Sequence, residues 1–415
     1  MSFTMTADEV IPPAVMHITI YPAEGASHSS AGDLSALAGY TKALFAHFSP
    51  AMRARHVVLT NRKSESRRTF VDDGLEVREV WDKGSWRYPW QIVQEARRLP
   101  EHRVVHLQHE FNQFGGAVSL PLTLFMLVCL RLLRRRIVIT LHEVLSLRQI
   151  DTEFLRRSSI RYPAWMTRLV VRVYYGALCG LADVLVVQDE HFAEVLRREY
   201  KARAPIHIVR IGTDILEPPP RSQARERWSL PADGRVALFF GTLDWRKGLD
   251  ILVDAWAMLP QGLCALVIAG GKPMRVQHTA DFQRWFASLE AKVRGNSAIR
   301  MVGFVDDRDM PALFGAADLV VLPYIVPQRV SAVFNQAASY GVPLIASDEF
   351  VDQAVPAMVF EKSAAALAEK VRWALEDGLT SLKESVLEFR HANSWSRSAA
   401  ELARIYRGAT PGESS

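Results

Sequence analysis

Residues 235–257 constrain the fold more than any other stretch, because an apolar strand runs through Gly241 into an amphipathic helix. The unbroken apolar run at 236–240 predicts a buried strand, and the apolar residues within 249–256 recur at helical spacing. Such a junction gathers free backbone N–H groups and the positive end of a helix at one point, and Lys247 adds a full charge there. The stretch therefore predicts an anion-binding site.

This junction is not a P-loop, because the GxxxxGK[ST] pattern is absent and Lys247 precedes its glycine. An ordinary strand-to-helix turn, with Arg246 and Lys247 in solvent, is the alternative, since a fold by itself does not imply a function. The local sequence leaves both interpretations open.

Strand-like and helix-like segments alternate along the whole chain. Short β-branched apolar runs are followed by stretches whose apolar residues recur at helical spacing, which predicts an α/β protein with doubly wound parallel sheets. The predicted strands lie at 15–21, 55–60, 75–80, 103–108, 136–141, 183–188, 206–210, 236–240, 263–269, 298–304, 318–322 and 343–346. Predicted helices of the first half and the chain end lie near 34–48, 89–99, 117–134, 163–181, 189–200 and 394–408.

The length of 415 residues predicts two domains, because one core rarely organises a chain of this size. Three successive prolines at 218–220 can continue neither a helix nor a central strand, so the polar segment 217–234 is predicted to be the interdomain linker. The alternation restarts after it. We therefore expect an N-terminal domain at 1–215 and a second domain at 216–393.

The composition is typical of a folded protein, with 49% hydrophobic and 23% charged residues. The first residues lack a basic segment followed by an apolar core, so no signal peptide is expected. Cys129, Cys179 and Cys264 lie far apart in apolar surroundings, which is typical of reduced core cysteines. These features favour a cytoplasmic location.

The positive net charge of +5 comes from the first half, where residues 1–215 hold 28 Lys and Arg against 22 Asp and Glu. The apolar stretch 117–130 is too short to span a bilayer and ends in a basic run with Arg131, Arg134, Arg135 and Arg136. This pattern favours contact with an anionic membrane surface or an anionic acceptor. A merely solvated basic face is the alternative, and no nucleic-acid partner is expected.

Polar residues collect where strands of the first half end, which is where open α/β sheets bind ligands. The predicted strand at 15–21 leads into a loop that contains Gly32. The strand at 103–108 is followed by His109 and Glu110, and the strand at 136–141 is followed by His142. Either histidine could instead be a structural residue bonded to the backbone. A zinc site from His106, His109 and Glu110 is disfavoured, because neither an HExxH pattern nor a cysteine ligand accompanies them.

Four blocks follow one another in the second half: FFGTLDWRKGLDILVDA, LVIAGG, IRMVGFVDDRDMPALFGAADLVVLPY and SAVFNQAASYGVPLIASD. Their order and spacing resemble the retaining GT-B glycosyltransferases of family four (glycosyl transferases group 1). HLQHEFNQFGG and VITLHEV resemble a branch of the same family, and the helix at 394–408 resembles its last helix, which crosses back to the first domain. The resemblance implies two Rossmann-like domains facing across a cleft, with a nucleotide-diphosphate sugar held mainly by the second.

The resemblance also implies roles for single residues. Lys247 would contact the donor diphosphate, Ser331, Ala332 and Val333 would form the turn beside it, and His142 would lie near the transferred sugar. A lysine and preorganised amides can stabilise a leaving diphosphate without a metal, and no DxD motif stands at a strand end, so no metal or cofactor is expected. Further donor-binding roles fall on Gly241, Thr242, Gly270, Gly271, Gly303, Phe304, Val305 and Gln336, and acceptor-binding roles on Gly32, His109, Glu110, Gly115 and Gly116.

The chain departs from the family pattern at three positions. Thr242 stands where much of the family has an arginine, and Gln328 and Gln336 stand where it has an acidic pair. We expect Arg246 to supply the missing positive charge. Gln336 can still hydrogen-bond a ribose hydroxyl.

The resulting expectation is a hexosyltransferase that acts with retention of configuration, with Lys247, Arg246 and His142 as its catalytic residues. It would transfer a sugar from a nucleotide sugar to a glycan or lipid-linked acceptor in cell-surface or exopolysaccharide synthesis, in the cytoplasm or peripherally on the inner face of the membrane. The alternative, motivated by the three departures, is a catalytically silent GT-B protein that binds a partner or a membrane.

Overall fold

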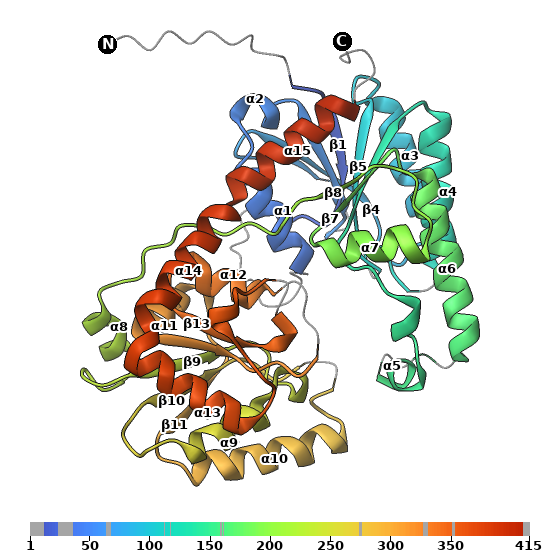
Figure 1. Ribbon diagram of the computed structural model, residues 1–415. Helices are drawn as coiled ribbons and strands as arrows, with labels where there is room; N and C mark the ends of the chain where they lie inside the picture. The colour runs from blue at the N-terminus through green and yellow to red at the C-terminus, as the bar shows by residue number, and fades with distance from the viewer. Residues whose placement is uncertain are drawn as a thin grey trace, which may run out of the picture. The chain divides into compact units, whose positions relative to one another are not determined.

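The computed structural model describes residues 12–23, 36–63, 68–111, 113–116, 118–157, 160, 162–273, 276–326, 331–350 and 353–409. Contacts divide the chain into two compact units (Figure 1). Unit 1 consists of Met1–Arg210 and Trp395–Ser415, and unit 2 consists of Ile211–Ser394. The last helix thus belongs to the unit that is built from the first half of the chain.

Unit 1 contains a sheet in the order β3-β4-β2-β1-β5-β6-β7-β8. Neighbouring strands are parallel except β3 and β4, which pair in an antiparallel hairpin at the sheet edge. β3 was not predicted, although the Asp73-Gly74 turn that closes this hairpin, with both φ angles positive, is a sequence signal for it. The strands are β1 (Val15–Ile18), β2 (His56–Asn61), β3 (Thr69–Asp72), β4 (Leu75–Trp81), β5 (Val104–His109), β6 (Arg136–Leu141), β7 (Val184–Val187) and β8 (Ile206–Ile208).

The helices of unit 1 connect these strands as crossovers. The longer ones agree with the predicted segments, whereas α2 and α5 are short additions. Their bounds are α1 (Ala36–Ala46), α2 (Pro50–Arg53), α3 (Tyr88–Arg98), α4 (Ser119–Leu132), α5 (Thr152–Arg157), α6 (Ala164–Leu181), α7 (Glu190–Glu199) and α15 (Trp395–Ala409). None of the helices within the described residues is long and apolar enough to cross a bilayer.

A polar cluster lies inside unit 1, where α15 packs on α1. Tyr406 of α15 is fully buried, and its hydroxyl lies 2.6 Å from Nδ1 of His106 on β5. The other ring nitrogen of His106 lies 2.7 Å from the hydroxyl of Thr140. Burial, together with His142 and His56 nearby, lowers the pKa of His106 to about 3, so the ring is neutral and acts as a structural link between the chain end and β5.

Unit 2 contains a fully parallel sheet in the order β11-β10-β9-β12-β13-β14. The strands are β9 (Val236–Phe240), β10 (Ala265–Ala269), β11 (Ile299–Gly303), β12 (Leu319–Leu322), β13 (Leu344–Ser347) and the unpredicted two-residue β14 (Val359–Phe360). The helices are α8 (Arg221–Arg227), α9 (Leu249–Met258), α10 (Ala280–Arg294), α11 (Met310–Ala316), α12 (Ala332–Ser339), α13 (Ala364–Trp373) and α14 (Leu379–Ala392). Both units therefore have the predicted doubly wound arrangement.

The predicted linker at 217–234 is wrong for most of its length, because α8 packs against α11 as part of unit 2. Arg225 of α8 is 1% exposed. Its guanidinium donates to Asp318 Oδ2 at 2.8 Å and to the backbone oxygens of Ala316, Pro231, Ala232 and Gly234. The polar residues that indicated a linker belong to a helix instead, and one of them, Arg225, is buried and joins α8 to the sheet.

The arginine run after α4 is partly bonded within unit 1, although Arg131, Arg134 and Arg136 are exposed. Arg135 is 9% exposed and donates to the backbone oxygens of Ala96, Pro100 and His102, where α3 ends. Arg131 and Arg136 both pair with Asp183, at 3.3 and 3.5 Å. Three of the four predicted surface cations are thus bonded within unit 1.

Replacing Arg225 with methionine should lower the unfolding free energy of unit 2 by about 3–5 kcal/mol, because Asp318 would stay buried without its main partner. Arg227→Met on the same helix is the control, since Arg227 is exposed and forms a surface pair with Asp309 worth about 0–1 kcal/mol. Urea denaturation followed by circular dichroism measures both changes. Equal effects of the two substitutions would contradict the structural role of Arg225.

Candidate functional site

In unit 2 the strand order places the carboxyl ends of β9 and β12 side by side. The chain proceeds from β9 to β10 and β11 on one side of the sheet and then returns to β12 on the other side of β9. In open α/β sheets, ligands bind at such a reversal of strand order. The loop after β9 contains Lys247, and the segment after β12 leads to Ser331 at the start of α12.

Three glycines form the adjacent sheet edge, at the ends of β9, β10 and β11. Gly241 N donates to Ala269 O at 3.0 Å, and Gly270 N donates to Gly303 O at 2.7 Å. A Cβ on Gly270 would lie 1.7 Å from Gly241 O, so only glycine allows this approach. The three predicted donor-binding glycines thus lie together.

Other predicted donor-binding residues extend this edge. Gly271 O accepts a hydrogen bond from Leu243 N at 2.9 Å, and a Cβ on Gly271 would lie 3.4 Å from the ring of Phe304. Phe304 is 65% exposed and offers its ring to solvent, as a stacking surface for a nucleobase would, whereas Val305 is buried in the core of unit 2. Thr242 is exposed in the loop after β9.

Asp244 organises the loop after β9. Its Oδ1 caps the short 3₁₀ turn Trp245–Lys247 by accepting from Arg246 N at 2.9 Å, and Oδ2 accepts from Arg246 Nη2 at 2.6 Å. Although burial alone would raise the pKa of Asp244, the Arg246 guanidinium lowers it, so the carboxylate stays ionised. The expected free charge of Arg246 is therefore paired with Asp244, a residue that sequence reasoning missed.

The loop after β9 is locked against the segment after β12. Gly248 has a φ of +71°, and a Cβ at this position would lie 1.7 Å from Pro323 O. Ile325 N donates to Arg246 O at 3.0 Å. This close approach fixes the position from which Lys247 projects and explains why the helix α9 begins after a glycine.

Lys247 lies at the junction of these two segments. Its ammonium lies 3.8 Å from the ring centre of Tyr324, which is a cation–π contact. Burial and the nearby charge of Arg246 lower the pKa of Lys247 to about 8, although Asp244 acts in the opposite direction. The site therefore holds a partly desolvated cation whose charged form a bound anion would stabilise.

The start of α12 lies next to this lysine, because a Cβ on Gly241 would contact both Val333 and Tyr324. Ser331 is the N-cap of α12, and its Oγ accepts from Phe334 N at 3.3 Å. The amides of Ala332 and Val333 fall at the first positions of the helix, which lack intrahelical acceptors. Gln336 is half-buried one turn further along α12. Gln328 lies outside the described residues.

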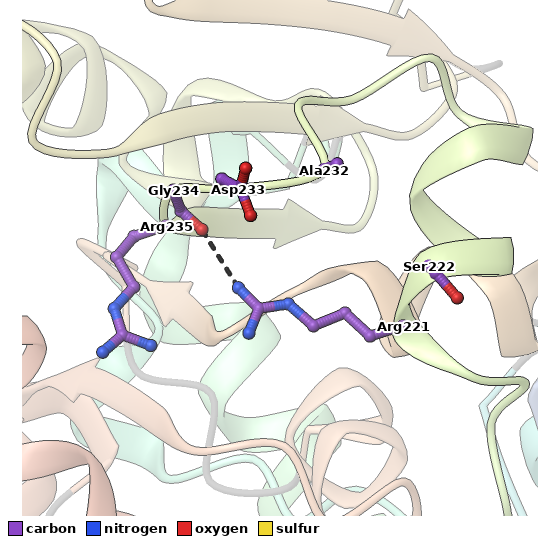
Figure 2. Close-up of a pocket in the computed structure, with 6 residues that line it drawn as sticks. All are labelled: Arg221, Ser222, Ala232, Asp233, Gly234 and Arg235. Atoms are coloured by element: carbon purple, nitrogen blue, oxygen red, sulfur yellow. Dashed lines mark hydrogen bonds between the residues drawn. The ribbon is translucent and has the colours of Figure 1, made fainter.

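A shallow pocket of about 440 Å³ lies at the opposite edge of the unit 2 sheet (Figure 2). Arg235 stands immediately before β9, so this pocket lies where the strand begins rather than where it ends. Asp318 already pairs with Arg221 at 2.9 Å and with Arg235 at 3.8 Å. The pocket is therefore not a candidate for the donor site. Its lining residues are Arg221, Ser222, Ala232, Asp233, Gly234 and Arg235.

In unit 1, His142 follows β6 and both of its ring nitrogens are engaged. Gln188 Nε2 donates to Nδ1 at 2.6 Å, which assigns the proton to Nε2, and Nε2 lies 2.7 Å from Gln108 Oε1. The edge of the ring also packs on Tyr40. Burial, with His109 nearby, lowers the pKa of His142 to about 3. His142 is thus a neutral, oriented ring, and sequence reasoning missed both glutamines.

The predicted acceptor-binding residues of unit 1 differ in their exposure. His109 is buried, and its Nε2 lies 2.7 Å from the Tyr174 hydroxyl, which fits the structural alternative. Glu110 is half-buried, and burial raises its pKa. Gly115, followed by Gly116, packs against the backbone of Gly84. Gly32 lies outside the described residues.

The zinc alternative fails on geometry. His106 and His109 are three residues apart on β5, so their side chains point to opposite faces of the sheet, and each has its own hydroxyl partner. Among the residues that the structure describes, no group of three His, Cys, Asp or Glu side chains could hold a metal ion.

Residues 234–377 match the model of the family described as Glycosyl transferases group 1, and this range contains the loop after β9 and the start of α12. This stretch, which includes most of unit 2, thus has the sequence pattern of that family. The D-inositol 3-phosphate glycosyltransferase 1 of Catenulispora acidiphila is 30% identical over 255 residues, which cover 57% of this chain and 60% of that protein. The chain thus matches about 60% of the length of this curated relative.

Solved structures of similar fold cover nearly the whole chain. Sucrose-phosphate synthase from Thermosynechococcus elongatus has a TM-score of 0.69 at 19% identity, over 95% of this chain and 98% of that chain. HepE from Anabaena, in complex with UDP-glucose, has a TM-score of 0.66 at 15% identity, over 95% of this chain and 99% of that chain. These similarities confirm the predicted GT-B fold.

Gly248→Ala should lower the unfolding free energy of unit 2 by about 3 kcal/mol or more, because the added Cβ would overlap Pro323 O. Gly262 is the matched control, since its φ is +81° but a Cβ at this position would have no heavy atom within 4 Å, so Gly262→Ala should cost only about 1 kcal/mol. Equal costs in urea unfolding would show that the loop after β9 is not locked.

Nucleoside diphosphate binding should weaken as the pH rises above about 8. In the free protein Lys247 loses its proton near this pH, and only the ammonium form attracts the anion, so affinity is highest below it and falls by up to about tenfold per pH unit above it. Lys247→Arg keeps its charge and should show no such fall. Calorimetry at a series of pH values measures the affinity and also detects proton uptake on binding near pH 8. If the affinity of the wild type changes with pH as little as that of the variant, Lys247 is not the titrating group.

Proposed function

We propose that this protein is a retaining, metal-independent hexosyltransferase that moves a sugar from a nucleotide-diphosphate sugar to a glycan or lipid-linked acceptor. The observation that carries the proposal is the junction in unit 2, where Lys247, with its lowered pKa, lies beside the start of α12 and the glycine edge. This arrangement suits a developing diphosphate charge, because the cation and the amides are already oriented.

The proposed reaction is a same-face displacement at the anomeric carbon. The bond from this carbon to the diphosphate oxygen breaks while the bond to the acceptor oxygen forms, and the proton of the acceptor hydroxyl passes to the departing diphosphate. Lys247 and the amides of Ala332 and Val333 stabilise that diphosphate. His142 positions the sugar, and Arg246 acts mainly by holding the loop through Asp244.

Support for the donor comes from a relative. The solved HepE protein is in complex with UDP-glucose, so UDP-sugars are the first donors to test here, beside GDP- and ADP-sugars. In this proposal Phe304 contacts the base and Gln336 contacts the ribose. A hydrogen bond from Gln336 is weaker than one from a carboxylate would be, because the amide is neutral.

We further propose a role in cell-surface or exopolysaccharide synthesis, in the cytoplasm and peripherally at the inner face of the membrane. The three cysteines are all free, which is typical of a reducing compartment. The excess of basic residues in the first half supports contact with an anionic surface.

Two substitutions should separate donor binding from transfer. Lys247→Ala should weaken nucleotide binding and lower transfer by about 100-fold or more, as the loss of one oxyanion donor does. His142→Ala should leave nucleotide affinity nearly unchanged, because Lys247 and α12 belong to the other unit, and should lower transfer by about 100-fold. Calorimetry with the nucleotide measures the change in affinity. Product analysis measures the change in transfer, and excess EDTA in that assay tests whether transfer is independent of a metal.

His391→Ala, at an exposed position on α14, is the control for loss of a histidine. If His142→Ala lowers the melting temperature together with binding and transfer, His142 is a structural residue and not a positioning one. A wild-type protein that binds a nucleotide sugar but never transfers or hydrolyses it would favour the silent GT-B alternative.

A further inference from the structure

The helix α4 of unit 1 exposes a row of large apolar side chains. α4 packs against both α3 and α6 (Figure 1). Residues spaced by three, four or seven positions lie on the same side of a helix. Such a row is formed on α4 and at its start by Val118, Phe125, Val128 and Leu132, the last of them 77% exposed.

The neighbouring helix α6 also exposes large apolar side chains. Trp165, Leu169 and Val173 follow one another at intervals of four residues, and Val170 lies beside them. All four are exposed, Trp165 to 67%. We call the exposed apolar residues of α4 and α6 named here the α4–α6 face. Monomeric soluble proteins rarely expose contiguous apolar surfaces of this kind unless the surface binds something.

The helices α4 and α6 themselves carry charges of one sign. The sequence contains no Asp or Glu between Glu110 and Glu143, which includes all of α4, and none between Glu153 and Asp183, which includes all of α6. Arg168 and Arg172 of α6 are both exposed beside Leu169 and Val173. The apolar surface is therefore bordered by cations.

The helix α3, which also packs against α4, and the residues just before it add exposed aromatic side chains. Trp86 and Trp90 are exposed, and each has a guanidinium over its ring: Arg87 at 5.4 Å from the first and Arg97 at 5.5 Å from the second. Tryptophan and arginine prefer the boundary between water and lipid, since each combines an apolar body with a polar end.

A basic pocket of about 540 Å³ adjoins the α6 side of this surface. Arg172 contributes to both, and Arg148, Arg198 and Lys201 also line the pocket. Its carboxylate, that of Glu199, is already engaged by Ser146 Oγ at 2.7 Å and Leu147 N at 2.6 Å. Arg198 is already paired with Glu194 at 2.5 Å, so the pocket offers mainly Arg148, Arg172 and Lys201 to an anionic group.

We propose that the α4–α6 face docks on an anionic lipid bilayer, with its apolar side chains in the interfacial layer and the basic pocket against lipid phosphate groups. Apolar helices bordered by arginine and tryptophan bind such surfaces through buried area and charge together. A second copy of this chain is the less suitable occupant, because it would bring Arg168 and Arg172 against like charges. The inference deepens the proposed membrane contact, on which it rests, and it does not depend on the proposed sugar transfer.

The test is co-sedimentation of the full chain with phosphatidylcholine vesicles, with and without about one third phosphatidylglycerol, at low and high salt. The wild type should bind the anionic vesicles more tightly, and salt should weaken this binding. The variant Phe125→Ser/Trp165→Ser/Leu169→Ser should bind about 100-fold more weakly or worse. Arg148→Gln/Arg172→Gln should lose about tenfold or more and much of the salt dependence.

Matched controls come from exposed residues elsewhere. Val71→Ser/Ile215→Ser/Met258→Ser removes three exposed apolar side chains, and Arg284→Gln/Arg308→Gln removes two exposed arginines, so both variants should bind vesicles like the wild type. Melting temperatures show that each variant is folded. A nitroxide label on Cys129, the partly exposed cysteine of α4, should become less accessible to water-soluble quenchers when anionic vesicles are added.

The proposal is overturned if the wild type does not sediment with anionic vesicles, or if the apolar variant binds them as the wild type does. It is also overturned if the wild type is a dimer in light scattering that the apolar variant dissociates, since the face would then join two copies. These assays contain no nucleotide sugar, so failure of the proposed transfer reaction leaves their outcome unchanged.

Discussion

Parallel strands that are buried on both faces need a crossover segment between each pair, and this requirement brings every carboxyl end to the same edge of a sheet. The polar chemistry of both units follows from it. In unit 2 the edge joins Gly241, Gly270 and Gly303 through backbone hydrogen bonds. In unit 1 the same rule places His109 and His142 at neighbouring strand ends, where β5 and β6 pair residue by residue.

The two units use their buried charges in different ways. Arg225 and Arg246 are each paired with a buried carboxylate. These ion pairs stabilise the position of α8 and the conformation of the loop after β9. Lys247 instead lies over an aromatic ring and has a lowered pKa. In unit 1 the buried rings of His106 and His142 are neutral, because burial and the neighbouring histidines all lower their pKa. In the proposed reaction, Lys247 is therefore the residue of unit 2 whose protonation a bound diphosphate would favour.

The sequence was sufficient where a local pattern determines the structure. The apolar run at 236–240 could only be a buried strand, and the family blocks located Lys247 and Ser331. Contacts between distant residues could not be predicted: nothing in the sequence links His106 to Tyr406 or His142 to Gln188. The helix α8 was missed because its helical residues are mostly polar and its one buried cation, Arg225, looks like a solvated residue in the sequence.

The burial of Tyr406 in unit 1 has a consequence for synthesis on the ribosome. Domains usually fold in the order in which they emerge, but unit 1 cannot complete its core until the last helix has been made. Unit 2 is a continuous segment and emerges complete before that helix. Unit 1 therefore stays incompletely folded, with the surface of α1 that binds α15 uncovered, until the end of synthesis. A ribosome that stops after Ser394 would release a chain in which unit 2 is complete and unit 1 lacks its last helix.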